Sequence, residues 1–401
     1  MLNISEKAKG FPYSPIRKLV PYSVAAKARG IKVYHLNIGQ PDIPAPQEAI
    51  DAVKNTITTS VEYSFSEGNH SYVNVLVDYY KSVNIPITMK DIIVTTGGSE
   101  AIVFALNAII NPGDEVLIPE PFYANYTTFA KQCGANVVPI TACIENGFAL
   151  PAIETFEEKI TPRTKAIMIC NPSNPTGYLY SREELEKLSA IAKKHNLYII
   201  SDEVYRDFIY DGEGKLHYSI MEIEGMEEHA IMIDSVSKKF SMCGIRIGAI
   251  VSKNKEVMDA AMRLAQARLS PPLFGQIASE AAFGIGKKYF EEVNAEYKKR
   301  RDYLYEALNK IPNVTCPKPK GAFYLIVKLP VDNVDKFAVW LLESFSYEGE
   351  TVMLAPASGF YATPGLGQQE ARLAYVLEVE ELGRAAVILE KAIEEYNRIA
   401  K

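Results

Sequence analysis

The stretch DSVSKKFSMCGIRIG, residues 234–248, brings together side chains that can do chemistry. Lys238 follows Ser235 by three residues and precedes Arg246 by eight. A lysine that loses its proton can form a Schiff base with a carbonyl compound, and burial beside a cation such as Arg246 favours that loss. The guanidinium can also bind a phosphate through two hydrogen bonds. Two other interpretations stay open: Lys238 and Lys239 as a solvated surface pair, or Ser235 with Lys238 as the catalytic pair of a serine hydrolase.

Two polar stretches directly follow apolar runs further upstream. SDEVYRDF, residues 201–208, places Asp202 and Tyr205 after LYII, and CNPSNPTG, residues 170–177, places Asn174 after a similar run. Ligands of open α/β sheets bind at the carboxyl ends of strands, so these side chains are expected to meet. Each also has an ordinary structural interpretation, because aspartate often caps a helix and Asn-Pro or Thr-Gly often forms a turn.

A glycine pair joins another apolar run to a helix that we expect over residues 100–110. TTGGSEAI, residues 95–102, contains Gly97, Gly98 and Ser99 at this junction. Glycine lets a backbone approach a ligand closely, and the amides at a helix N-terminus attract a phosphate. These three residues are therefore candidate phosphate ligands, although any tight turn can use two glycines.

The order and spacing of these motifs resemble the class I/II aminotransferases, which bind pyridoxal 5′-phosphate (PLP) on the aspartate aminotransferase fold, fold type I. The resemblance extends from about Ile16 to the last helix, with NIGQPDIP, YSFSEG, PEPFYANY, GAFY and EARLAY also matching in order. It implies that Lys238 is the catalytic residue and carries the cofactor as a Schiff base. The further cofactor contacts that it implies are Tyr63, Gly97, Gly98, Ser99, Tyr123, Asn174, Asp202, Tyr205, Ser235 and Arg246.

In this resemblance the residue types suit their roles on the cofactor ring. Asp202 keeps the ring nitrogen protonated, which makes the ring an electron sink. Tyr205 and Asn174 are partners of the 3′ oxygen, and Tyr123 stacks on the ring face. Without the neighbouring motifs, Tyr123 is better interpreted as a core or surface aromatic residue.

The same resemblance extends to the substrate and to a second subunit. It implies substrate contacts from Gly39, Asn174 and Arg372, with the Arg372 guanidinium binding the α-carboxylate through two hydrogen bonds. An arginine exposed on a strand is the alternative for Arg372. Tyr63 implies a homodimer in which each site borrows this residue from its partner. GAFY, ending at Tyr324, is interpreted mainly as scaffold.

The chain departs from some relatives where they carry an arginine for a distal carboxylate. Near this position it reads LAQARLSPP, with Ala265 and then Arg268 as a weak candidate. The resemblance therefore leaves the amino donor open among aspartate, alanine, aromatic and other neutral amino acids.

The expected function is ping-pong transfer of an amino group from an L-amino acid to a 2-oxo acid. Aspartate with 2-oxoglutarate is the leading expectation by family frequency. A β-lyase, a racemase or a side-chain synthase on the same scaffold is the first alternative. A PLP-binding regulator is another, but such proteins usually carry a further DNA-binding domain, and this chain begins close to its catalytic scaffold. A serine hydrolase would leave Asp202 and Asn174 unexplained.

Alternating apolar runs and amphipathic stretches between about residues 90 and 251 predict an α/β fold with a mostly parallel, seven-stranded sheet flanked by helices. SREELEKLSAIAKKH, with Ser181 as N-cap, predicts one of these helices. Later segments predict a smaller α+β domain. The expected division is an N-terminal segment, 1–48, that packs with the small domain, a large cofactor-binding domain, 49–290, and a small domain, 291–401.

The composition is that of an ordinary globular enzyme. Of 401 residues, 48% are hydrophobic and 23% charged, the net charge is -6, and the five cysteines lack metal-ligand spacing. We therefore expect no metal, no nucleic acid and no membrane as partner. The first residues lack a signal-peptide pattern, so we expect the cytoplasm.

Overall fold

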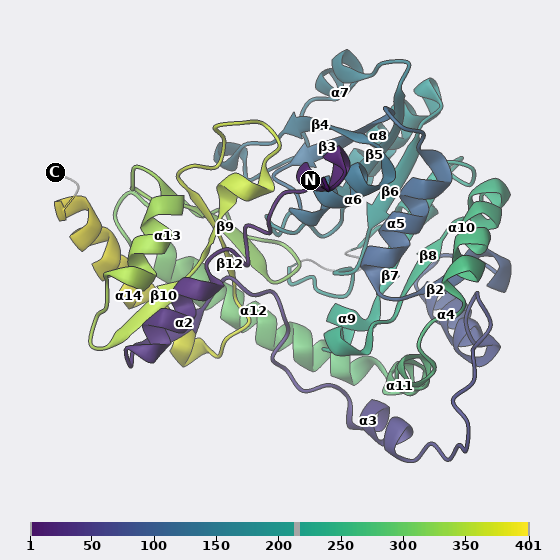
Figure 1. The fold of residues 1–401 in the computed structure, drawn as a ribbon, viewed down its shortest axis with the longest axis horizontal. Coiled ribbons are helices and arrows are strands. Elements are labelled where there is room, and N and C mark those ends of the chain that lie inside the picture. The colour runs from purple at the N-terminus through teal and green to yellow at the C-terminus, as the bar shows by residue number, and fades with distance from the viewer. Residues whose placement is uncertain (1, 212–216, 400–401) are drawn as a thin grey trace.

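The computed structural model describes residues 2–211 and 217–399 and contains the predicted α/β sheet (Figure 1). Its strands run in the order β2-β8-β7-β6-β5-β3-β4, and only β8 is antiparallel to its neighbours. All seven predicted strands are present. Their bounds are β2 Ile92–Thr95, β3 Glu115–Glu120, β4 Asn136–Thr141, β5 Thr164–Cys170, β6 Tyr198–Asp202, β7 Ala230–Ser235 and β8 Gly248–Val251.

Helices cover both faces of this sheet. Alternate side chains along a strand point to opposite faces, so every strand contributes to two apolar layers. We call the face covered by α5, α6 and α10 the front and the face covered by α4, α8 and α11 the rear. The front helices are α5 Gly98–Ile109, α6 Asn125–Cys133 and α10 Lys255–Arg268; the rear helices are α4 His70–Ser82, α8 Arg182–His195 and α11 Leu273–Phe283.

Helix α8 forms where its sequence predicted it. The Ser181 hydroxyl accepts a hydrogen bond from the amide of Glu184, whose carboxylate accepts one from the Ser181 amide. Leu185, Leu188 and Ile191 are buried on its rear-layer face. Capping satisfies amides that the helix itself leaves unpaired, and the apolar stripe holds the helix on the sheet.

A second, smaller part of the molecule contains two further sheets (Figure 1). The N-terminal segment contributes a strand that pairs in parallel with a strand near the C-terminus, while three other strands form an antiparallel sheet. These elements are β1 Lys32–His35 with β10 Glu350–Met353, and β11 Ala355–Pro356, β12 Glu370–Ala374 and β9 Tyr324–Lys328. The domain boundaries near residues 48 and 290 stay a prediction.

Helices surround these smaller sheets, and one long helix passes between the two parts of the molecule (Figure 1). The small-part helices are α2 Val20–Ala28, α13 Val334–Glu343 and α14 Val379–Ile399, and the long helix is α12 Lys287–Asn309. The remaining α-helices are α1 Glu6–Lys9, α3 Gln47–Lys54, α7 Ile153–Lys159 and α9 Val236–Lys239. Short 3-10 helices cover Met89–Asp91, Ile144–Asn146, Ile220–Glu222, Cys243–Ile245 and Ala357–Phe360. Within the described ranges, no helix is long and apolar enough to cross a membrane.

Candidate active site

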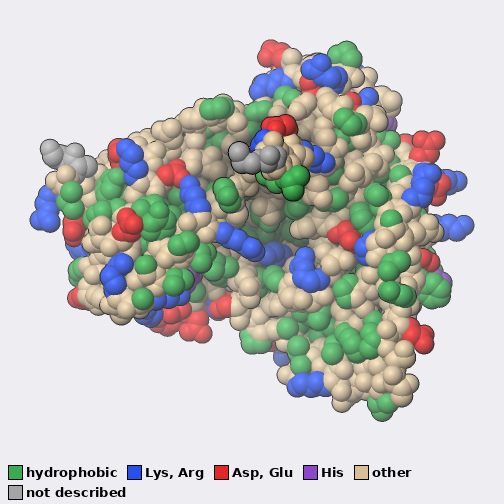
Figure 2. Space-filling view, viewed as in Figure 1, with side chains coloured by type: hydrophobic (Ala, Val, Ile, Leu, Met, Phe, Trp, Pro, Cys, Tyr) green, Lys and Arg blue, Asp and Glu red, His purple; other side chains and the backbone are tan. Residues whose placement is uncertain are grey.

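The predicted site residues gather at the carboxyl ends of neighbouring strands. Cys170 at the end of β5 lies opposite Asp202 at the end of β6, and Asp202 pairs with Ile233 near the end of β7. The motifs that follow these parallel strands therefore start side by side. Figure 2 shows the surface hollowed between the two parts of the molecule, with lysine and arginine side chains along the hollow.

Lys238 lies on the short helix α9, which begins directly after β7. Its ammonium group donates to the carbonyl oxygen of Gly39 at 2.8 Å and lies 3.7 Å from the Cys243 sulfur. Ser235 caps this helix, because its hydroxyl accepts from the Ser237 amide. Lys238 is partly buried and Lys239 is 1% exposed. The two lysines are therefore not a solvated surface pair.

Asp202 is buried on the front of β6. Burial raises the pKa of its carboxyl to about 6, although hydrogen bonds from Tyr126 and from the Val204 amide act in the opposite direction. The Tyr126 hydroxyl donates to Oδ2 at 2.6 Å, and the Val204 amide donates to Oδ1 at 3.3 Å. No α-helix starts within the three residues after Asp202. The carboxylate thus caps only a local turn and can also serve a cationic ligand.

Asn174 and Tyr205 lie together, as predicted, and a further tyrosine joins them. The Asn174 amide lies 3.5 Å from the Tyr205 hydroxyl, which lies 3.0 Å from the Tyr324 hydroxyl. Tyr324 donates in turn to the Gly39 carbonyl oxygen at 3.3 Å. Gly39 has no room for a side chain, because a Cβ there would lie 1.8 Å from the Tyr324 hydroxyl oxygen. The interpretation of GAFY mainly as scaffold was therefore incomplete, because the Tyr324 hydroxyl lies among the site residues.

Arg372 projects from β12 of the small part and is 1% exposed, so it is not a solvated strand residue. Its Nη1 donates to Asn174 Oδ1 at 3.2 Å and its Nη2 donates to the Asn37 carbonyl oxygen at 2.5 Å. Burial lowers its pKa from the usual value. Its Nε, although buried, has no hydrogen-bond partner among the described residues. A buried guanidinium that no carboxylate among the described residues neutralises is well suited to bind an anionic ligand.

The candidate phosphate ligands meet because β2 and β7 both flank β8. Gly97 has a φ of 78°, and a Cβ there would lie 2.2 Å from the Arg246 Nη2 atom. Arg246 Nη1 donates to the Cys243 carbonyl oxygen at 2.7 Å. Gly97 caps α5 without a side chain that could accept from its first amides, and Ser99 is exposed in that first turn. This turn beside a guanidinium fits a phosphate group.

Two predicted aromatic contacts have different surroundings. Tyr123 is partly buried, and its ring lies edge-on to Tyr126 with centroids 5.5 Å apart. Burial raises the pKa of Tyr123 to about 12. Tyr63 is 80% exposed and lines a separate hollow with Asn69 and Leu273, so its contact with a cofactor stays a prediction that requires a second subunit.

Arg268 is held inside the large part of the molecule. Its Nη1 donates to Glu100 at 2.8 Å, and its Nη2 donates to the carbonyl oxygens of Ser66 at 2.9 Å and Val94 at 3.3 Å. Burial lowers its pKa. Because Glu100 already neutralises it, Arg268 is a poor partner for the distal carboxylate of a substrate.

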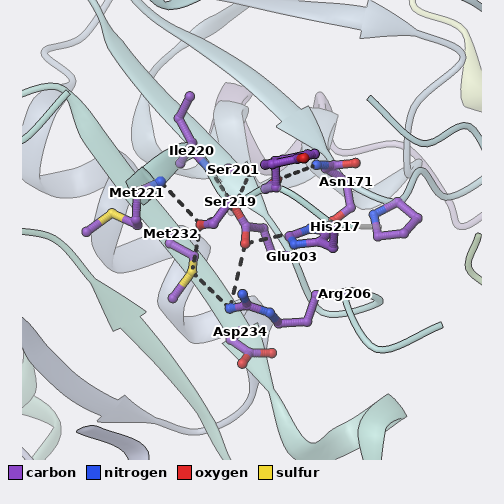
Figure 3. A network of polar contacts seen from close by, with 12 residues as sticks. Asn171, Ser201, Glu203, Arg206, His217, Ser219, Ile220, Met221, Met232 and Asp234 are labelled. Carbon is purple, nitrogen blue, oxygen red and sulfur yellow. Dashed lines mark hydrogen bonds and ion pairs between the residues drawn. The ribbon is translucent and has the colours of Figure 1, made fainter. Parts of the chain in front are cut away.

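The sequence did not single out a buried polar network behind Asp202 (Figure 3). The next residue, Glu203, is fully buried, and its Oε1 accepts from the hydroxyls of Ser201 and Ser219 and from the Ile220 amide at 2.9 to 3.1 Å. Burial raises the pKa of Glu203 to about 7, against the influence of Arg206. The network fixes the loop after β6 from the rear.

Together these groups bring an amine, a buried carboxylate, an anion-binding turn and a guanidinium to the ends of neighbouring strands. The sequence alone missed Tyr126, Tyr324 and Asn37. Tyr126 follows Tyr123 by three residues at the start of α6, which is a helical spacing that could have drawn attention to it. Asn37 contributes only its carbonyl oxygen, for which side-chain type gives no signal.

Known proteins are similar to this chain in sequence and in fold. The family model for aminotransferase class I and II matches residues 31–387. An aspartate aminotransferase of Bacillus sp. strain YM-2 is 33% identical, covering 94% of this chain and 93% of its own. One from Pyrococcus horikoshii is 32% identical, covering 98% and 97%.

Solved structures agree with the fold. A single mutant of the Thermus thermophilus aspartate aminotransferase superposes with a TM-score of 0.89 at 28% identity, covering 98% of this chain and all of its own. The alanine aminotransferase from Pyrococcus furiosus gives the same TM-score and coverage at 32% identity. The motif order, the seven-stranded sheet and these matches show that this chain belongs to the class I and II aminotransferase family.

Proposed function

We propose that this aminotransferase binds PLP through Lys238 and moves the amino group of an L-amino acid to a 2-oxo acid in ping-pong order. The chain of contacts from Lys238 through Gly39, Tyr324, Tyr205 and Asn174 to Arg372, at the strand ends beside Asp202, carries this proposal. A β-lyase or racemase would use the same anchoring residues, but the matched relatives bear aminotransferase names.

The residues present fit the cofactor. Asp202 would hold the ring nitrogen, Tyr205 and Asn174 the 3′ oxygen, and Arg246 with the Gly97 turn the phosphate. When bound, PLP supplies an electron sink for charge that develops on the substrate α-carbon. The buried Asp202 carboxylate would keep the ring nitrogen protonated, because its own negative charge is costly in this apolar layer without a cationic partner.

Lys238 is the proton carrier of the site. Its amine lies on the rigid helix α9 and is partly shielded from water. The Nζ atom of Lys238 would take the proton from the substrate α-carbon and hold it. A lysine can remove a proton in this way only when its amine is neutral.

Arg372 and Gly39 hold the substrate. The guanidinium would bind the α-carboxylate through two hydrogen bonds, and this fixes the α-carbon relative to Lys238. The carbonyl of Asn37 and the amide oxygen of Asn174 orient the guanidinium from behind. Arg372 thus selects 2-amino and 2-oxo acids as a class.

Aspartate with 2-oxoglutarate is the proposed substrate pair, supported by the names of the relatives from Bacillus and Pyrococcus horikoshii. One observation favours a second candidate, a neutral amino donor such as alanine. Both Nη atoms of Arg268 are already bonded, to Glu100 and to two carbonyl oxygens, although its buried Nε has no partner among the described residues. The structural neighbour from Pyrococcus furiosus is named an alanine aminotransferase.

We also propose that the protein acts as a cytoplasmic homodimer. Tyr63 is exposed and lies on a segment with further exposed apolar side chains, Ile57, Val61 and Phe65. Covering this segment with a second copy would bury them and bring Tyr63 to the partner's phosphate site.

A donor panel tests the proposal. Purified protein loaded with PLP is mixed with single amino acids, and the cofactor absorbance is followed before and after addition of 2-oxoglutarate. We expect aspartate or alanine to change the spectrum and 2-oxoglutarate to restore it. A spectrum that no amino acid changes would refute the aminotransferase assignment, whereas a change without restoration by any 2-oxo acid would favour a lyase.

A further inference from the structure

Lys239, the neighbour of the catalytic lysine, lies in a buried ionic cluster on the rear of the sheet. Its ammonium nitrogen lies 3.1 Å from Asp207 Oδ2 and 3.2 Å from Asp234 Oδ2. It also lies 3.8 Å from the ring centroid of Tyr79, a cation–π geometry. The lysine side chain is fully enclosed. We call Tyr79, Tyr80, Asp207, Asp234 and Lys239 the rear cluster.

Each carboxylate of the rear cluster has further donors. The Tyr79 hydroxyl donates to Asp207 at 3.0 Å, and the Tyr80 hydroxyl donates to Asp234 Oδ2 at 3.0 Å. Asp234 Oδ1 accepts from the amide of Ser235 at 2.7 Å. The cluster is therefore well satisfied, and its members have little freedom to change their geometry.

Lys239 and Asp207 are both ionised. Burial lowers the pKa of Lys239, but Asp207 and Asp234 outweigh that effect and hold it above its ordinary value. Burial raises the pKa of Asp207, but Lys239 and Arg206 outweigh it and hold that pKa below its ordinary value. Lys239 and Asp207 therefore keep their charges over the whole neutral range.

Every charged member is a near neighbour, along the chain, of a proposed cofactor ligand. Lys239 follows Lys238, Asp234 precedes Ser235, and Asp207 comes two residues after Tyr205. The Lys239 ammonium thereby joins the helix that carries the catalytic lysine to the loop that carries Tyr205. The link bridges segments that are about thirty residues apart in sequence.

Stability of the folded protein does not by itself explain such a buried ionic cluster. Taking ions out of water is costly, and apolar side chains of similar volume often stabilise a buried site equally well or better. What a buried, fully paired ion cluster can supply is one defined geometry.

We propose that Lys239 is a positioning residue: through Asp207 and Asp234 it fixes Lys238 relative to Tyr205 and the cofactor ring. The inference rests on the proposed function. It assigns to the rear cluster control over how long the enzyme retains PLP and how fast Lys238 transfers protons, rather than over substrate affinity.

The test uses the PLP-loaded enzyme and the variant Lys239→Met, which keeps the length of the side chain and removes its charge. We expect PLP release after dilution to become at least tenfold faster and kcat to fall at least tenfold, with KM for the amino donor changed less than threefold. Lys239→Arg, which restores a cation, should recover part of both losses.

A matched control separates positioning from general loss of stability. Glu115→Gln weakens an ion pair far from the rear cluster, between the buried Glu115 and the exposed Arg163 at the amino end of β3. It should lower the melting temperature while leaving PLP release and kcat within twofold of wild type. If Lys239→Met does not fold, Asp207→Asn replaces it, because Lys239 then retains Asp234.

The outcomes are distinct. A folded variant with a lower melting temperature but normal PLP release and normal kcat would overturn the positioning role. A wild-type enzyme whose spectrum no amino donor changes would instead overturn the proposed function, and the PLP release rates would still report on the rear cluster.

Discussion

The front and the rear of the same strand ends hold charge in opposite ways. On the front, Lys238 donates to one carbonyl oxygen, and Arg372 retains a buried Nε without a partner among the described residues. On the rear, Lys239 has two carboxylates, each of which is bonded to a tyrosine. The neighbouring lysines thus have different roles. Lys238 can still bind a ligand, whereas the ammonium of Lys239 is fully occupied by contacts that fix the local geometry.

The largest effect should come from the front lysine. Lys238→Ala removes the proton carrier, so kcat should fall by roughly 10⁴-fold, the upper range for a positioned acid–base group. The melting temperature of the cofactor-free protein should stay within a few degrees, because Lys238 donates to only one protein oxygen. Stopped-flow kinetics and calorimetry measure both. Lys187→Ala, at a surface lysine, is the control, and full turnover by Lys238→Ala would end the distinction between the two lysines.

The second effect concerns the arginine of the small part. Arg372→Leu removes charge-assisted hydrogen bonds to the substrate carboxylate, so kcat/KM should fall by about 10²-fold, or about 3 kcal/mol. Arg372→Lys keeps a charge but loses the two-pronged geometry and should recover little. Initial rates over a range of donor concentrations give both values. Equal activity of Arg372→Lys and wild type would contradict two-pronged binding.

A smaller effect should appear on the rear as a pH dependence of stability. The pKa of Glu203 is about 7 in the folded protein against 4.5 for an ordinary glutamate. Its contribution to stability is therefore complete below pH 4.5 and is lost as pH rises through 7, a loss of about 3 kcal/mol. Glu203→Gln should lack this loss.

Urea denaturation of the cofactor-free protein at pH 5 and pH 8 measures this loss of unfolding free energy. The difference in unfolding free energy between Glu203→Gln and wild type should move in favour of the variant by about 2.5 kcal/mol between these pH values. If the unfolding free energies of the variant and of wild type changed in parallel with pH, burial would not raise the pKa of Glu203.

The smallest effect on catalysis should come from Arg268, which belongs to the structure and not to the hollow. Because Arg268 is bonded to Glu100, Arg268→Gln should change the ratio of kcat/KM for aspartate to that for alanine by less than about threefold, although stability falls by about 1–3 kcal/mol. Assays with both donors give the ratio. A fall in kcat/KM for aspartate alone would show that Arg268 contacts the substrate.

The sequence predicted the layers of the fold because they depend on local pattern. The seven strands are short apolar runs. Ser181 and Glu184 marked the start of α8 through capping chemistry that involves only neighbours. Asp202 ends β6, and Lys238 and Asn174 follow the ends of β7 and β5, but the roles of these residues stay predictions, as do those of Tyr63 and Ser99.

The sequence could not reveal the rear cluster, because its members look like surface residues. A lysine next to another lysine usually lies in water, and only folding brings Asp207 and Tyr79 to Lys239. Tyr324 was similarly hidden, since its hydroxyl reaches Tyr205 only when the small part packs on the large one. Contacts between distant segments depend on topology, which local pattern does not encode.

Helix α12 relates the two parts of the molecule by its residue count. Asn294 donates to the Asp207 carbonyl oxygen, and six residues later Arg300 donates to Asp42 and to the Val376 carbonyl oxygen. One inserted residue between them would rotate these contacts apart by about 100° and separate them by about 1.5 Å. The number of residues in this interval is thus as much a part of the active-site geometry as any side chain, although neither Asn294 nor Arg300 belongs to the set that binds cofactor or substrate.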